Sequence, residues 1–369
     1  MSSMFGEHVR ISVFGQSHGP CVGAVLDGLP AGERIDEAVL AAFMARRAPG
    51  QRLSTPRKEP DRVRIVSGLA DGVTCGAPLC LIIDNTDTRS SDYAQLRRVP
   101  RPGHADLPAH LKWRGFNDVR GGGHFSARLT APLCAAGNVL MQLLTRRGVR
   151  IGAHLYAACG EKDQPFDPLS VSPAELDLCA SRYPTVLDEA AGERMMARVS
   201  ALRDAGDSGG GIVECAVLGL PAGLGDPMFG GLENRLSAAV FAIPAVKGIE
   251  FGEGFAAASL TGSVNNDGDR MRCGRPVPVT NHAGGILGGL STGAPLLFRA
   301  AFKPTPSIAL EQRSVDLQSG TDTSLSVSGR HDPCVALRAV PCVEAAAALV
   351  IADVLLPSDR PGETQAPRI

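Results

Sequence analysis

Glycine is the feature that most restricts what this chain can fold into. The 369 residues include 43 glycines and 27 prolines, gathered in short islands rather than in a repeat or a linker. Such islands mark places where the backbone closely approaches another backbone segment or a ligand. We therefore expect a fold in which several loops converge on one site. The islands are GQSHG, RPGHAD, RGGGHFSAR, GDSGGG, PAGLGD and NHAGGILGGLSTG.

The apolar segments between the islands predict a mixed fold, because some have the spacing of strands and others that of helices. No linker of distinct composition divides the chain. We therefore expect one α+β domain over residues 1–356 and a flexible tail over 357–369. Residues 85–126 are predicted to form a long functional loop, and 160–188 a surface excursion. Predicted strands span 9–14, 21–28, 62–68, 78–85, 209–221 and 293–303, and predicted helices span 36–47, 129–149, 189–207, 232–243 and 343–355.

Composition excludes several classes of protein. A formal net charge of -1 and an aromatic content of 4% give no general bias toward nucleic acid or an anionic membrane. The 10 cysteines include no C-x-x-C pair, which indicates reduced, buried thiols rather than disulfides or a zinc site. The N-terminus shows no signal-peptide pattern. We expect a cytoplasmic protein that has no metal and binds neither membrane nor nucleic acid.

Basic residues are concentrated between positions 46 and 64, where only Glu59 and Asp61 are acidic. Arginine side chains bind carboxylates and phosphates in a bidentate manner, so this stretch could be an anion site. A solvated loop with exposed ion pairs is an equally good interpretation. The basic residues are Arg46, Arg47, Arg52, Arg57, Lys58, Arg62 and Arg64.

Four motifs carry candidate chemistry. The glycines of RGGGHFSAR precede a predicted helix and could cradle a phosphate. His104 of RPGHAD could protonate a leaving oxygen, and Asp332 of GRHDPC is either a base or half of a salt bridge. The five glycines of residues 281–293 could lie under a flat ring or allow tight sheet packing. Because no acidic cluster is present, a magnesium-dependent phosphotransferase is disfavoured. The residues alone indicate an enzyme acting on a small phosphorylated anion.

Taken together and in order, the islands resemble the chorismate synthase family over residues 6–356. The matching motifs are FGQSHG, RPGHAD, RGGG with SAR, GDSGGG, AVKG, NHAGGILGG, KPT with a following serine, and GRHDPC. The resemblance implies a sandwich of helices between antiparallel sheets, usually as a homotetramer. It implies a carbon–oxygen lyase that converts 5-enolpyruvylshikimate 3-phosphate to chorismate and phosphate. That 1,4-elimination is the last common step of the shikimate pathway toward the aromatic amino acids, and it requires reduced FMN.

The resemblance also implies roles for individual residues. His18 would lie beside the reduced flavin and supply or hold a proton there. His104 would protonate the departing phosphate, and Asp332 would be the base that assists removal of the substrate proton at the flavin. The expected substrate-binding residues are Arg47, Arg52, Arg101, Arg128 and Arg330. The expected FMN contacts are His124, Phe125, Ser126, Pro244, Ala245, Gly288, Lys303, Pro304, Thr305, Pro306, Ser307 and Arg330, and Arg47 and Arg52 also match positions linked to NADPH.

The chain departs from the family pattern at a few of these positions. Gln16 stands where the family usually has glutamate, which removes one charge near His18. His124 and Phe125 replace an arginine and a small residue, and Leu129 replaces a glutamate. Because an arginine and a carboxylate are lost together, we interpret this exchange as compensated. Pro244 stands where asparagine is common, so a contact at that position is expected from the backbone.

Two alternative functions compete with this interpretation. One is a related FMN-dependent enzyme with a shifted substrate, and the other is a non-catalytic module that binds flavin or an anion. The presence of His18, His104 and Asp332 together disfavours both. The sequence leaves open whether NADPH reduces the flavin on this protein or an external reductase supplies it.

Overall fold

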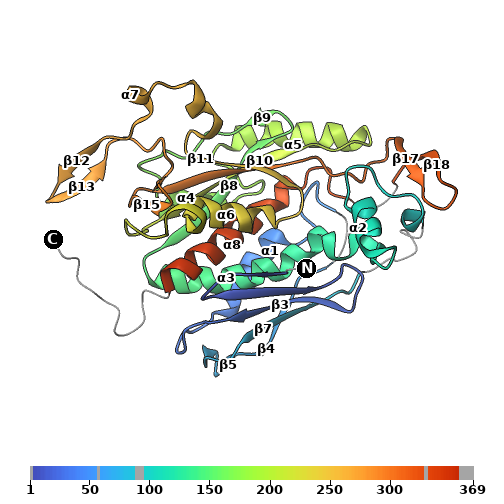
Figure 1. Cartoon of the computed structure of the whole chain (residues 1–369), viewed down its shortest axis with the longest axis horizontal. Helices are drawn as coiled ribbons and strands as arrows, with labels where there is room; N and C mark the ends of the chain where they lie inside the picture. The colour runs from blue at the N-terminus through green and yellow to red at the C-terminus, as the bar shows by residue number, and fades with distance from the viewer. Residues whose placement is uncertain (1–2, 56–58, 88–94, 328–330, 357–369) are drawn as a thin grey trace.

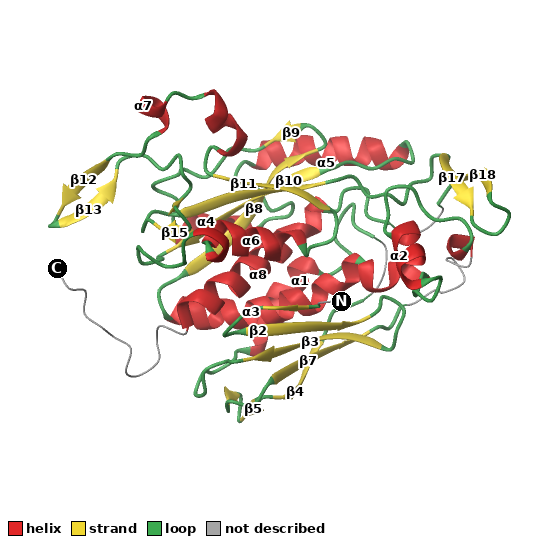
Figure 2. Ribbon diagram, in the orientation of Figure 1, coloured by secondary structure: helices red, strands yellow, loops and turns green. Residues whose placement is uncertain are grey.

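The computed structural model describes residues 3–55, 59–87, 95–327 and 331–356, and it shows two antiparallel sheets with helices between them. Figure 1 shows the three layers, and Figure 2 shows the same view with helices and strands in separate colours. The predicted α+β sandwich is therefore confirmed. The predicted tail, 357–369, lies outside the described residues.

The first sheet has the strand order β1-β2-β3-β7-β4. Strand β7 alternates buried and less buried side chains, and β3 does so except at the buried Gly23, as expected for a sheet with one face on a core. The predicted strands in this part of the chain are confirmed. The bounds are Met4–Phe5 (β1), Arg10–Gly15 (β2), Cys21–Asp27 (β3), Val63–Ser67 (β4) and Leu79–Asp84 (β7).

The second sheet has the order β11-β16-β10-β8-β9 and lies on the other side of the helices. Smaller hairpins, β5–β6, β12–β13, β14–β15 and β17–β18, extend from the two sheets. The bounds of the main strands are Arg150–Ala158 (β8), Glu161–Lys162 (β9), Gly211–Leu218 (β10), Val246–Phe251 (β11) and Leu296–Phe302 (β16). The hairpin strands are Leu69–Ala70 (β5), Val73–Thr74 (β6), Asp269–Arg272 (β12), Arg275–Pro278 (β13), Ile286–Leu287 (β14), Leu290–Ser291 (β15), Gln312–Asp316 (β17) and Thr321–Leu325 (β18).

Helices α1, α3, α6 and α8 form the layer between the sheets (Figure 2). Helix α8 is buried on almost every side, and this explains its nearly continuous apolar sequence. It begins at Ala336, earlier than the predicted start at 343, and includes Pro341. The helix bounds are Glu37–Arg47 (α1), Asp106–Trp113 (α2), Thr130–Arg146 (α3), Pro173–Ser181 (α4), Glu189–Asp204 (α5), Leu232–Phe241 (α6), Gly262–Asn265 (α7) and Ala336–Leu355 (α8).

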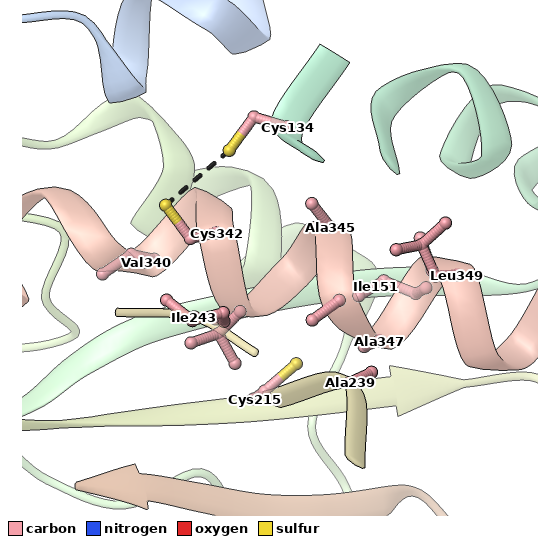
Figure 3. Packing of buried hydrophobic residues seen from close by; sticks show 14 of the residues in the cluster. Cys134, Ile151, Cys215, Ala239, Ile243, Val340, Cys342, Ala345, Ala347 and Leu349 are labelled. Atoms are coloured by element: carbon pink, nitrogen blue, oxygen red, sulfur yellow. Dashed lines mark hydrogen bonds between the residues drawn. The ribbon is translucent and has the colours of Figure 1, made fainter. Parts of the chain in front are cut away.

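The contact between α3 and α8 forms the centre of the core. A Cβ atom added to Gly137 of α3 would lie 2.3 Å from the Cβ of Ala345 in α8, so the glycine permits this close approach. One turn away, the sulfur atoms of Cys134 and Cys342 are 3.7 Å apart, as Figure 3 shows. None of the 10 cysteines forms a disulfide, but Cys75 and Cys273 are exposed, so the prediction of buried thiols is wrong for those two.

Two segments predicted to be irregular contain helices. The stretch from 85 to 126 includes α2, which begins at Asp106, an acidic residue suited to a helix N-terminus. The stretch from 160 to 188 includes α4, whose capping box joins Ser172 and Glu175. Both helices are short, so they contain too few apolar residues for a helical pattern to be recognised in the sequence. Among the described residues, no helix is long and apolar enough to cross a membrane.

A buried ion cluster fixes the 160–188 segment to the second sheet, so it is not a surface excursion. His154 of β8 is fully buried, with Nδ1 3.0 Å from Asp163 and Nε2 3.0 Å from Glu214. Burial alone would lower the pKa of His154, but its hydrogen bonds to both carboxylates outweigh burial and raise it. Asp163 also accepts backbone hydrogen bonds from Leu187 and Asp188.

We expect Gly137→Ala to lower the free energy of unfolding by about 1–3 kcal/mol, because the backbone of α8 cannot yield without moving the core. Urea denaturation measures the change. The matched control is Gly262→Ala in α7, where a new Cβ meets no atom within 4 Å and stability should not fall. Equal effects of the two substitutions would contradict this account of the α3–α8 contact.

We expect His154→Gln to cost about 3 kcal/mol at pH 6 and less at pH 9. Because the native pKa of His154 is raised, its imidazolium contributes fully below the ordinary histidine pKa, and the contribution is lost as pH rises through the native value. Urea unfolding at both pH values tests this, with the exposed His8→Gln as control. A cost that does not change with pH would mean that the cluster holds a neutral imidazole.

Candidate active site

A cavity of about 600 Å³ lies where the ends of four helices meet two motif-bearing loops. Its wall includes residues at the C-terminal ends of α1 and α6 and near the N-terminal ends of α3 and α8. The RPGHAD and KPTPS segments complete it. The predicted site residues that line the cavity are Arg47, Arg101, His104, His124, Phe125, Ser126, Arg128, Pro244, Ala245, Lys303, Thr305, Pro306, Ser307 and Asp332.

One buried carboxylate joins two of the predicted substrate-binding arginines. Asp61 accepts short hydrogen bonds from both Arg47 and Arg128. Burial alone would raise the pKa of Asp61, but the two guanidinium charges outweigh burial and lower it. Glu59 lies 3.5 Å from Arg128. The four charges balance, so the arginines are held in place by the protein itself.

The other described arginines at the cavity are paired in the same way. Arg101 binds Asp106 through Nε at 2.7 Å, and Arg338 binds Asp332 through Nη1 at 2.8 Å. The cations that line the cavity without a carboxylate partner among the described residues are Lys247 and Lys303. Burial, with the nearby Lys247 charge, lowers the pKa of Lys303. Within the part of the chain that the structure describes, an anion entering the cavity therefore meets these two lysines as cations without a carboxylate partner.

Asp332 is positioned from two elements. Its Oδ1 accepts a hydrogen bond from the backbone N–H of Thr55 at 2.8 Å, and its Oδ2 accepts one from Arg338 at 2.8 Å. Arg338 also donates to the carbonyl of Arg47 at 3.0 Å, which links α8 to the end of α1. The carboxylate predicted as a base is thus held at the cavity by the N-terminal turn of α8.

The RGGG loop lies against His18. A Cβ atom on Gly121 would lie 2.3 Å from the His18 ring, and the backbone of Gly121 has a φ of +59°. Gly121 lines the cavity, whereas the imidazole of His18 is buried behind it. The N–H of Gly122 donates to the carbonyl of Val119 at 3.1 Å. This donor is thus used within the turn and is not available to a phosphate.

The two residues that depart from the family pattern make contacts of their own. The His124 ring lies 2.8 Å from the carbonyl oxygen of Gly15 through Nδ1 and 2.9 Å from the hydroxyl of Ser3 through Nε2. His124 thus ties the loop that carries His18 to the cavity wall. The Phe125 ring packs against Trp113, with centroids 5.5 Å apart, and adds an apolar surface to the cavity.

Several predicted residues lie away from this cavity. Arg52 borders a separate pocket of about 280 Å³ beside Tyr183. Gly288 lies in the turn between β14 and β15, and Pro304 is not among the lining residues. Arg330 lies outside the described residues. No cluster of three potential metal ligands occurs within the part of the chain that the structure describes.

Sequence reasoning missed the partners of the site residues. Asp61, Asp106, Lys247 and Arg338 were not identified, although each directly contacts a predicted residue or lines the cavity. The signal available for Asp61 was its position as one of two acids within a basic stretch. The signal for Asp106 was its place two residues after His104 in RPGHAD.

A cavity walled by histidines, carboxylates and cations, on helices held between two sheets, is a site for an enzyme that acts on small anions. The family model for chorismate synthase matches residues 9–356. The chorismate synthase of Lancefieldella parvula is 48% identical, covering 98% of this chain and 99% of its own. That of Thermococcus kodakarensis is 46% identical, covering 96% of this chain and 97% of its own.

The fold agrees with the sequence comparison. A crystal structure of chorismate synthase superposes with a TM-score of 0.76 at 26% identity, covering 96% of this chain and 93% of that chain. The chain belongs to the chorismate synthase family. The predicted family and the predicted fold class are thereby confirmed.

We expect Asp61→Asn to lower the free energy of unfolding by about 3–5 kcal/mol, because two buried guanidinium groups lose their shared counter-charge. Chemical denaturation measures this. The control is Asp84→Asn, whose carboxylate pairs with Arg64 where both side chains are 54% exposed, and it should cost under about 1 kcal/mol. Similar losses for the two variants would show that the Asp61 charge is not needed.

Proposed function

We propose that this chain is a chorismate synthase, a carbon–oxygen lyase that converts 5-enolpyruvylshikimate 3-phosphate to chorismate and phosphate. The observation that carries the proposal is the convergence of RPGHAD, RGGGHFSAR, KPTPS and the Asp332 turn on one cavity. RPGHAD and the Asp332 turn are more than 200 residues apart in sequence, yet these segments bring an imidazole, a carboxylate and cations together. Membership of the family supports the same reaction.

Reduced FMN is the cofactor that we propose for this cavity, and the residues present fit it. The cavity volume lies in the range of small-molecule sites. Phe125 offers an apolar face, and Lys247 and Lys303 offer charge for a phosphate or an anionic ring. The buried hydroxyl of Thr305 has no hydrogen-bond partner among the described residues, so it is available to a ligand. When bound, reduced FMN supplies the electron density that eases departure of the phosphate.

The protein's own groups would handle the protons. His104 would donate a proton to the phosphate oxygen as its bond to the ring carbon breaks, since a protonated phosphate leaves more easily. Asp332 would act as the base on the side where the ring proton departs, and His18 would hold a proton behind the RGGG loop. General acid–base assistance of this kind contributes about 10²–10⁴-fold.

Substrate binding is assigned to Arg47, Arg101 and Arg128, with Arg330 and Arg52 retained from the family resemblance. Because the first three are each paired with a protein carboxylate, Lys247 and Lys303 are the groups that would draw the anion into the cavity. Arg52 and Gly288 lie away from the cavity, so their roles toward NADPH and FMN remain proposals based on resemblance alone.

We extend the proposal to the organisation of the protein. Residues 1–356 would act as one catalytic domain, since a single apolar core includes residues from Val9 to Leu356. The enzyme would be cytoplasmic and homotetrameric, with neither nucleic acid nor membrane as a partner. NADPH would serve as an optional reductant for the flavin.

We expect His104→Ala and Asp332→Ala each to lower turnover by about 10²-fold or more, because each removes one proton-transfer group. The assay follows chorismate and phosphate together under anaerobic conditions with dithionite-reduced FMN. His110→Ala, in α2 but not at the cavity, is the control and should remain active. FMN binding should survive in both site variants. Wild-type turnover in either would remove that residue from the proposed role.

The same assay tests whether NADPH can reduce the flavin on this protein. Repeating it with oxidised FMN and NADPH alone shows whether the protein reduces its own flavin. Full activity with oxidised FMN and no reductant would contradict the proposed cofactor. Flavin binding without product would favour the related enzyme with a shifted substrate or the non-catalytic module.

A further inference from the structure

We propose that Asp106 is a positioning residue that fixes the imidazole of His104 so that its Nε2 atom is the one that transfers a proton. The inference deepens the proposed function and rests on it for the identity of the reaction. It adds Asp106 to Arg101 and His104 as a third functional residue of the RPGHAD motif.

Geometry makes Asp106 the partner of His104. Its Oδ1 lies 2.6 Å from Nδ1 of His104, and both side chains are largely shielded from solvent, with exposed fractions of 4% and 15%. Asp106 is the first residue of α2, and it follows His104 by two positions. The side chain therefore folds back over the Pro-Gly turn instead of capping its own helix, which has no side-chain cap.

Asp106 is a carboxylate throughout the physiological pH range. Its Oδ2 accepts from the backbone N–H of Arg101 at 3.1 Å and from Arg101 Nε at 2.7 Å, and its Oδ1 accepts from Arg101 Nη2 at 2.9 Å. Burial alone would raise the pKa of Asp106, but hydrogen bonds from Arg101 and His104 outweigh burial and hold it well below its usual range. A carboxylate that only accepts hydrogen bonds requires a proton on the nitrogen that faces it.

The guanidinium group of Arg101 also bears on which nitrogen of His104 carries the proton. Arg101 Nη2 lies 3.1 Å from Nδ1 and 3.4 Å from Nε2 of His104, but arginine is only a donor, and its shortest contact is with the Asp106 oxygen at 2.9 Å. The proton between Asp106 and His104 therefore sits on Nδ1. This leaves Nε2 as the nitrogen that gains and gives the transferable proton.

Asp106 also balances charge. When His104 carries a proton on both nitrogens, the ring and the Arg101 guanidinium are two cations in contact, and the Asp106 carboxylate lies between them. After Nε2 gives its proton to the departing phosphate, the Nδ1 proton stays in place and the ring is neutral. Asp106 itself takes up no proton, so the exchange is complete between His104 and the phosphate oxygen.

Two further contacts hold Asp106, Arg101 and His104 in place beside the cavity. Arg101 Nη1 donates to the hydroxyl of Ser307 at 3.1 Å, which ties the RPGHAD turn to the KPTPS turn. A Cβ atom on Gly122 would lie 3.2 Å from Nε2 of His104, so the glycine loop leaves room for the ring on that side. The positioned nitrogen thus lies beside the loop that contributes Gly121 to the cavity wall.

The test uses Asp106→Asn, which keeps the size of the side chain and removes its charge. We expect kcat to fall by about 10²-fold while KM changes by less than about threefold, since positioning acts on the proton transfer. Asp316→Asn is the matched control, because Asp316 is a largely buried aspartate paired with Arg98 that touches neither His104 nor the cavity. Asp316→Asn should retain the wild-type kcat.

A second measurement does not depend on activity. In solid-state ¹⁵N spectra of protein labelled at histidine, with His104 assigned by its loss in His104→Gln, wild-type Nδ1 should be protonated. Asp106→Asn should reduce that preference while the melting temperature shows a folded protein. An unprotonated Nδ1 in the wild type, or an unchanged kcat in a folded Asp106→Asn variant, would overturn the proposal.

The two readouts separate this proposal from the proposed function. If the wild type forms no chorismate but Nδ1 is protonated as expected, the reaction has been misassigned and the positioning of His104 stands. If the wild type is active but Nδ1 is unprotonated, the reaction stands and the role of Asp106 fails. If Asp106→Asn does not fold, the protonation of Nδ1 in the wild-type spectrum alone tests the proposal.

Discussion

The close packing of α3 on α8 is the contact on which the rest of the structure depends. Both helices begin at the cavity: Ser126 and Arg128 lead into α3, and Asp332 leads into α8. The distance between the two helices therefore sets the distance between the glycine-loop side of the site and the carboxylate side. Buried Glu344 of α8 extends this control, because it binds Arg46 of α1 and the backbone N–H of Ala153 in β8.

Internal pairing is the principle that organises charge at the site. Asp61 and Asp106 hold arginines that the sequence alone would assign to a ligand. Asp332 holds Arg338 in the same way. In such pairs the guanidinium group has little freedom to move. A ligand that binds there therefore pays a smaller entropy cost for ordering the side chain. Among the described residues that line the cavity, Lys247 and Lys303 then remain as cations without a carboxylate partner, and the arginines are fixed in position. The cavity thus contains two kinds of cation, which are lysines without a carboxylate partner and arginines that a carboxylate holds in place.

The sequence predicted the regular elements well where periodicity extends over several turns or one full strand. Helices α1, α3 and α5 and strands β2, β3 and β7 were found because their own side chains determine which face is buried. Helices α2 and α4 were missed because eight or nine residues carry too little pattern. Likewise, motif residues such as His104 were visible, but the pairing of Asp61 with Arg128 depends on a backbone with positive φ at Asp61 and on a fold that joins positions 67 residues apart.

The contact of α8 with the residues before β2 joins parts of the chain that are synthesised far apart in time. Asp353 of α8 accepts hydrogen bonds from the backbone N–H groups of Glu7, His8 and Val9, residues 344 to 346 positions earlier. During synthesis at roughly 5–20 residues per second, those amides wait tens of seconds for their acceptor. Strands β2 and β3 can pair early, but the residues that precede β2 gain these hydrogen bonds only after α8 has been synthesised. Formation of the hydrogen bonds between Asp353 and residues 7–9 is therefore a late event in folding.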